Sequence, residues 1–107
     1  MSLDPDKIYA HIMASAKEWT VADEEARRLK ELQPIVLAEI ANQQPDKSMV
    51  ERKSLALASP EYRHHVTLMV AAKTKANAAL ARYKAAQNLA ELRRSEESTK
   101  RAEMQLR

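Results

Sequence analysis

The amino-acid sequence predicts an all-α protein: an elongated antiparallel helical hairpin with a short helix at the bend and a long C-terminal helix. Apolar residues recur at intervals of three, four and seven, which is the spacing of an amphipathic or coiled-coil helix. The chain contains no Gly, and strong helix formers dominate from Ser59 to about Gln105. No stretch shows the alternating or β-branched pattern of a strand.

The long C-terminal helix has the clearest start signal. Ser59 is a suitable cap for free N–H groups, Pro60 suits the first helical position, and Glu61 complements the positive end of the helix. A helix from there to Gln105 would be about 65 Å long at 1.5 Å per residue. Such a rod is too long for an ordinary globular domain of this size, so we expect self-association to complete its core.

The first helix begins at Asp4 and Pro5, another cap followed by proline. Thr20 gives a weak second capping signal, so a break there is an alternative. Pro34 should kink the helix or end it, and we prefer a kink because residues 35–40 continue the apolar face. That face is formed by Ile8, Ile12, Trp19, Ala22, Ala26, Leu29, Val36 and Ile40.

A polar loop, residues 42–47, leads to the bend. Ser48 and Glu51 form a capping box that starts a short helix through about Ala58. That helix ends before Pro60, because the residue before a proline avoids helical geometry.

We expect residues 1–107 to form a single helical domain. Residues 1–3 are a candidate cloning scar. The polar residues 93–107 are an arm that extends past the first helix, frays or pairs with another subunit.

The composition excludes many kinds of site. Without Gly the chain cannot form a P-loop or a dinucleotide-binding turn, and without Cys it has no disulfide, thiolate zinc site or Cys nucleophile. His64 and His65 are neighbours and point about 100° apart on a helix, so they are poor joint metal ligands. We therefore expect no metal and no cofactor.

An acidic cluster, Asp23 to Glu25, is the only candidate for acid–base chemistry. Arg27 and Arg28 follow it at helical spacing, which is typical of an exposed helix turn. We expect no catalytic residues and no enzymatic activity. The sequence also shows no signal peptide and no apolar run near about 18 residues, so we expect a cytoplasmic protein with no membrane partner.

Charge is unevenly distributed along the chain. Residues 1–59 carry a net charge of −2 and residues 60–107 carry +5, for a total of +3, and residues 62–90 contain no acid. Five cationic or titratable residues fall within about 20° of one another on a helix and form one row: His64, Lys75, Arg82, Arg93 and Lys100. The candidate nucleic-acid-binding residues are Arg63, His64, Lys73, Lys75, Arg82, Lys84, Arg93, Arg94, Lys100 and Arg101.

A row of cations can neutralise a phosphate backbone, with little preference for base sequence. The alternative is that the row is the solvated flank of a helix seam. Among the aromatic residues, Trp19 and Tyr83 are expected in the core, whereas Tyr62 is the candidate for base stacking. Alanine occupies two faces of the long helix, which suits an oligomer seam, packing within the chain, or both.

The sequence resembles small helical proteins of tailed bacteriophages. The likeness rests on Ser59-Pro60-Glu61-Tyr62, the alanine-rich helix after it, and the terminal Arg94-Ser95 and Arg101-Ala102-Glu103. Some of these proteins are similar to the UvsY-like recombination mediators. That resemblance implies an oligomer that binds single-stranded DNA and acts with a recombinase, in the cytoplasm of a bacterial host.

Two functional hypotheses follow. In the first, a non-enzymatic homo-oligomer binds single-stranded nucleic acid through the basic edge of the long helix. In the second, the chain is a phage structural, assembly or scaffold protein that acts only through helix–helix association.

Overall fold

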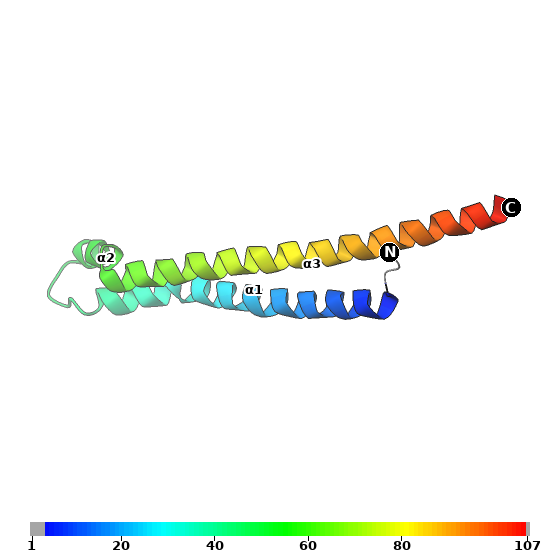
Figure 1. Ribbon diagram of the computed structural model, residues 1–107. Helices are drawn as coiled ribbons and strands as arrows, with labels where there is room; N and C mark the ends of the chain where they lie inside the picture. Colours follow the sequence, from blue (N-terminus) through cyan, green and yellow to red (C-terminus); the bar gives the residue numbers. More distant parts are fainter. Residues whose placement is uncertain (1–3, 107) are drawn as a thin grey trace. The chain divides into compact units, whose positions relative to one another are not determined.

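The computed structural model describes residues 4–106, which form three helices (Figure 1). They are α1 (Pro5–Ala41), α2 (Met49–Leu57) and α3 (Pro60–Leu106). The chain of α1 runs antiparallel to that of α3, and α2 lies at the bend, so the predicted helical hairpin is confirmed. The candidate cloning scar, residues 1–3, lies outside the described residues.

Capping side chains define the corner between α2 and α3. The backbone N–H of Glu51 donates to Ser48 Oγ at 3.2 Å, and that of Tyr62 donates to Ser59 Oγ at 3.2 Å. The Ser59 hydroxyl itself donates to the carbonyl of Ala56 at 2.7 Å. Ser59 therefore caps the start of α3 as predicted, and it also satisfies a carbonyl at the end of α2.

The first helix is continuous. Asp4 Oδ1 accepts from the N–H of Asp6 at 2.9 Å, which confirms the predicted start. The break considered at Thr20 is absent, because its hydroxyl donates back to the carbonyl of Ala16 at 2.9 Å and leaves the helix intact. The helix also passes through Pro34 and ends at Ala41, so it does not stop at the proline.

One arginine holds the loop between α1 and α2. Arg52 Nε donates to the carbonyl of Lys47 at 2.8 Å, and its Nη2 donates to the carbonyl of Pro45. These bonds tie the first turn of α2 to residues 45–47 of the loop.

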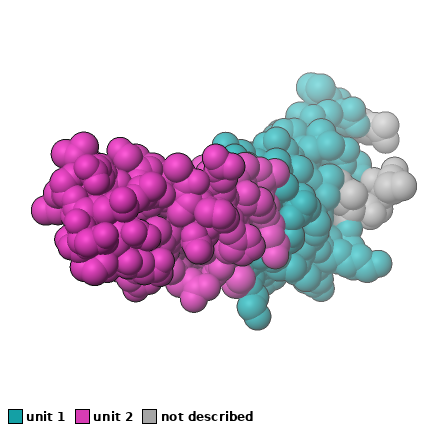
Figure 2. Space-filling model, turned by 90° about the vertical axis from the view of Figure 1, so that its left-hand side faces the viewer, with its two compact units in different colours: residues 1–20, 77–107 teal, residues 21–76 magenta. Residues whose placement is uncertain are grey.

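The chain divides into two compact units, which Figure 2 distinguishes by colour. One comprises residues 1–20 and 77–107, and the other comprises residues 21–76. In the first, the early turns of α1 pack against the later turns of α3, and the end of α3 extends past the start of α1 (Figure 1). In the second, α2 lies beside the facing parts of α1 and α3. A single domain over residues 1–107 stays a prediction.

Burial along α1 follows alternating intervals of four and three residues, the heptad spacing of a coiled-coil seam. The seam includes all eight predicted apolar positions, which are buried or half-buried. It also includes two polar side chains, Ser15 and Gln33, that fill the gaps between them. These two residues were not predicted because they are polar, although the heptad spacing includes their positions.

The matching seam on α3 has the same spacing and is dominated by alanine. Its members are His65, Met69, Ala72, Ala76, Ala79, Tyr83, Ala86, Ala90, Arg93 and Glu97, all buried or half-buried. Leu68, next to Met69 in the sequence, is exposed. Alanine side chains let two helices approach closely but bury little apolar surface, so the hairpin has a thin core.

Side-chain contacts join α1 to α3 in each unit. In residues 1–20 and 77–107, the rings of Trp19 and Tyr83 pack with centroids 5.6 Å apart, which confirms their predicted place in the core. In residues 21–76, the amide of Gln33 donates to the hydroxyl of Tyr62 at 2.7 Å. Within the described residues, no large side chain is fully buried.

Candidate functional site

The ten candidate cations of α3 fall in both units. Four, Arg63, His64, Lys73 and Lys75, belong to residues 21–76, and the other six belong to residues 77–107. Acidic residues of α1 lie close to several of them, which the sequence of α3 alone could not reveal.

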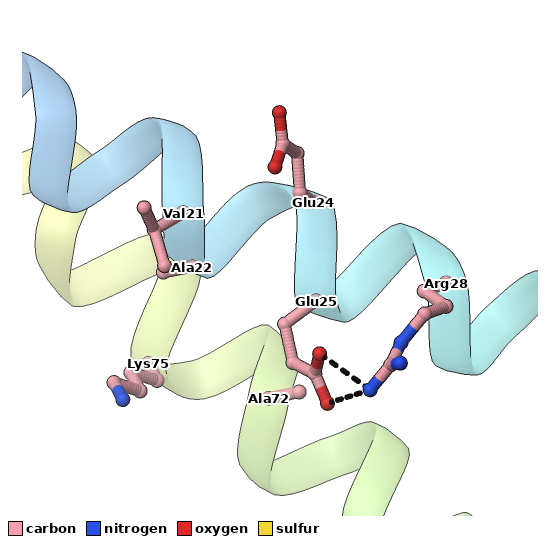
Figure 3. A pocket seen from close by; sticks show the side chains of 7 residues that line it. All are labelled: Val21, Ala22, Glu24, Glu25, Arg28, Ala72 and Lys75. Atoms are coloured by element: carbon pink, nitrogen blue, oxygen red, sulfur yellow. Dashed lines mark hydrogen bonds and ion pairs between the residues drawn. The ribbon is translucent and has the colours of Figure 1, made fainter.

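Lys75 lines a surface hollow of about 420 Å³ with residues of α1 that include Glu24 and Glu25 (Figure 3). The carboxylate of Glu25 turns to Arg28, whose Nη2 lies 2.9 Å from Oε2, and the amino group of Lys75 points away from that pair. Arg28 thus pairs with the acidic cluster at helical spacing as predicted, and Glu24 and Glu25 are exposed, whereas Asp23 is half-buried. The hollow is lined by two carboxylates and two cations, Lys75 and Arg28, so it offers a phosphate no net positive charge.

Lys73 belongs to a different cluster, which we call the two-helix basic patch: Arg27, Lys30 and Lys73. These three cations line a second hollow of about 360 Å³, together with Asp23. Asp23 pairs with Arg27 at 2.6 Å, so the patch keeps a net positive charge. Arg27 and Lys30 were not predicted as part of the site. The charge pattern of one helix does not indicate which cations of the neighbouring helix lie beside it.

In residues 1–20 and 77–107, ion pairs occupy much of the predicted edge. Arg82 pairs with Glu18 of α1, and Arg94 pairs with Glu91 at 2.7 Å. Both pairs are exposed, so each contributes only about 0–1 kcal/mol and can exchange with other partners.

Arg93 does not lie on a free edge. Its side chain is 27% exposed, occupies a seam position of α3, and pairs with Glu97 at 2.9 Å. It also lines a hollow beside Pro5 and Ile8 of α1. Arg93 therefore lies in the seam and not on an open edge, and its binding role stays a prediction.

The cause is a difference in period. The predicted row follows the 3.6-residue period of a straight helix, whereas the seam follows 3.5 residues, and the two drift by about 20° per heptad. The seam is well separated from the row at His64 and reaches it at Arg93. A row that is straight on a helical projection therefore does not remain at a constant distance from the partner helix.

The remaining candidates, Arg63, His64, Lys84, Lys100 and Arg101, are exposed. Within residues 4–106 the structure gives these five side chains no ion pair. Their binding role stays a prediction.

Tyr62 is not available as a base-stacking platform. It is half-buried, and its hydroxyl accepts the hydrogen bond from Gln33 across the hairpin. The aromatic ring that is exposed is that of Tyr9, at 66%. The prediction for Tyr62 was wrong because the first turn of α3 already faces α1.

His65 lies in the seam, as predicted, and His64 is exposed. His65 Nε2 donates to the carbonyl of Leu29 at 2.9 Å in a part of the hairpin where the ring is 7% exposed. This contact ties α3 to α1 in residues 21–76.

Replacing His65 by alanine should lower the free energy of unfolding by about 1–3 kcal/mol, because the carbonyl of Leu29 loses its side-chain donor in a buried setting. Urea unfolding followed by circular dichroism measures this. His64→Ala is the matched control and should change stability by no more than about 0.5 kcal/mol. Equal effects of the two changes would contradict the assignment of His65 to the seam.

Residues 4–106 contain neither a candidate metal site nor a candidate membrane span. No three His, Asp or Glu side chains gather there in a way that could hold a metal ion. None of the helices in this part of the chain combines the length and apolar character needed to cross a membrane.

Comparison with protein-family models, with curated proteins and with solved structures finds no match to this chain. The resemblance to recombination mediators therefore stays a prediction.

Proposed function

We propose that the chain is a non-catalytic assembly or scaffold protein that acts through helix–helix association. The proposal rests on one observation: small side chains form most of the core, whereas many large apolar side chains are exposed. Within residues 4–106, alanine supplies most of the buried apolar side chains, whereas fourteen large apolar side chains are exposed, among them Met49 at 82% and Leu106 at 89%.

The accessible surface supports the same proposal. It measures 8422 Å², whereas a compact monomer of 12.1 kDa would expose about 6,000 Å². Each large apolar side chain gains about 1.5–3 kcal/mol on full burial. Association with other helices would bury part of this surface and stabilise the hairpin by mass action.

The test is the native mass by light scattering over a concentration series, with thermal unfolding at each concentration. An assembly protein should form a discrete oligomer, and its unfolding midpoint should rise with concentration. A monomer with a constant midpoint at every concentration would overturn the proposal.

A second candidate function is binding of single-stranded nucleic acid, and the two-helix basic patch is what favours it. Arg27, Lys30 and Lys73 gather from two helices around one hollow, with Asp23 as the acid among them. Such a cluster suits a phosphate better than a row on one helix whose arginines are paired with carboxylates. An oligomer would repeat the patch and could contact several phosphates of one strand.

The double variant Lys30→Glu with Lys73→Glu should weaken binding of a labelled single-stranded oligonucleotide by about tenfold or more at low salt. It should also reduce the slope of log affinity against log salt by about 1.4, since single strands contribute about 0.7 per phosphate contact. Fluorescence anisotropy over a salt series measures both quantities.

The control is Lys7→Glu with Lys17→Glu, which makes the same change in net charge on α1 away from the patch. If both double variants weaken binding equally, the patch is not the binding site. If the unaltered protein fails to bind at low salt, this second function is excluded.

A further inference from the structure

The side of α3 that faces away from the seam carries its own heptad pattern. Exposed positions recur there at alternating intervals of three and four residues, and in residues 77–107 they include Ala78, Ala81, Ala85, Asn88, Leu92 and Ser95. The same spacing continues to Leu106 and back to His64, and none of these positions holds Lys, Arg, Asp or Glu. We call these positions the outer face of α3.

The outer face is opposite the seam on the helix. Each outer-face residue precedes a seam residue by one or two positions in turn. At about 100° per residue, the two faces are therefore centred about 150° apart. Because both repeat every 3.5 residues, they stay opposite along α3 and do not converge as the cation row and the seam do. A helix docked on the outer face would therefore leave the hairpin seam intact.

Charges beside the outer face are separated by sign along the helix. In the N-terminal part of the outer face, the flanking positions contain no acid and hold four bases: Arg63, Lys75, Arg82 and Lys84. In the C-terminal part, the flanking positions contain no base and hold three acids: Glu91, Glu96 and Glu103. Flanking charges of a coiled coil determine partner choice and orientation. A helix with this pattern is complementary to a second copy of itself that runs in the opposite direction.

We propose that the outer face of α3 is an interface at which two copies of this chain pair antiparallel. Placing Ala85 of each copy opposite Asn88 of the other aligns Ala81 with Leu92 and Ala78 with Ser95. This register sets Lys84 against Glu91 and Lys75 against Glu96, twice each by symmetry, and opposes no like charges. The inference rests on the proposed function, because it names the partner and the surface of that association.

The parallel arrangement is disfavoured by the same residues. In a parallel pair in register, Glu91 of each copy would flank Glu96 of the other, which places like charges together on both sides. No flanking position of that arrangement gains a pair of opposite charge. The contact of Glu91 with Arg94 is exposed and costs little to exchange, so it does not prevent the pairing with Lys84.

Charge reversal tests the orientation directly. Lys84→Glu alone and Glu91→Lys alone should each weaken self-association by about tenfold, because two attractive pairs per dimer become repulsive. An equal mixture of the two single variants should recover the affinity of the unaltered protein, since every pair in the mixed dimer is then of opposite charge. Sedimentation velocity over a concentration series measures the dissociation constants.

Cysteine substitution supplies a second measurement, because the chain has no Cys of its own. A mixture of Ala78→Cys and Ser95→Cys should give a disulfide-linked dimer under oxidation, whereas either variant alone should not. Circular dichroism checks that each variant keeps its helices, and both positions are exposed in the monomer.

The outcomes separate this inference from the broader function. If the protein stays monomeric at every concentration, both fail, and binding of an oligonucleotide by that monomer would favour the second candidate function. If it associates but the single charge reversals change nothing, or their mixture recovers nothing, the antiparallel interface fails while the assembly function stands.

Discussion

Ala86→Asp is expected to lower the free energy of unfolding by about 3 kcal/mol or more. Ala86 is 1% exposed and occupies the seam of α3 in the unit formed by residues 1–20 and 77–107. A carboxylate there would lose its hydration without a partner, and the closely packed alanine seam has no space for the larger side chain. Urea unfolding followed by circular dichroism, at one fixed protein concentration, measures the change.

Gln87→Asp is the matched control for this prediction. It introduces the same side chain one residue later in the same helix, at an exposed position that belongs neither to the seam nor to the outer face. Its effect should stay within about 0.5 kcal/mol. A comparable loss of stability in both variants would mean that helix propensity, and not burial against α1, determines stability at this point.

Features that depend only on neighbouring residues could be predicted from the sequence. Helix starts were predicted well at Ser48 and Ser59 because a cap acts on backbone groups within three residues. The seam of α1 was also predicted, since eight of its positions are apolar at heptad spacing. Ser15 and Gln33 were missed because a polar side chain at a seam position gives no hydrophobic signal, and only the spacing could have shown them.

The candidate site was predicted less well because it depends on the register between two helices. Glu18 and Arg82 are far apart in sequence, and no local pattern indicates that they pair. The same is true of Lys30 and Lys73, which meet in the two-helix basic patch. A single helix specifies the angular positions of its own charges, but the partner helix determines which of them stay open to a ligand.

The position of Arg93 depends both on the period of α3 and on its packing against α1. A projection at a constant 100° per residue places it on the cation row, whereas the 3.5-residue seam brings it against the first turns of α1. The heptad spacing was already visible in the alanines of α3. Applying that spacing to both faces of the helix would have placed Arg93 in the seam from sequence alone.

Trp19→Ala is expected to lower the free energy of unfolding by about 2–4 kcal/mol. Truncation of a fully buried Trp costs about 3–5 kcal/mol, and Trp19 is only half-buried, so the expected loss is about 1 kcal/mol smaller. Its ring is tilted at 41° to that of Tyr83, with centroids 5.6 Å apart, and this contact is lost as well. Few other large side chains are available in the alanine-rich seam to fill the space that the ring leaves.

Two further variants test whether the contact itself matters. Trp19→Phe keeps an aromatic ring against Tyr83 and should lose less than about half as much stability as Trp19→Ala. Tyr9→Ala removes an aromatic ring from the same helix where it is 66% exposed, and should cost no more than about 1 kcal/mol. Thermal and urea unfolding followed by circular dichroism suit all three variants. If Trp19→Ala proved no more costly than Tyr9→Ala, the alanine seam alone would hold α1 against α3 in this unit, and the Trp19–Tyr83 contact would contribute nothing measurable.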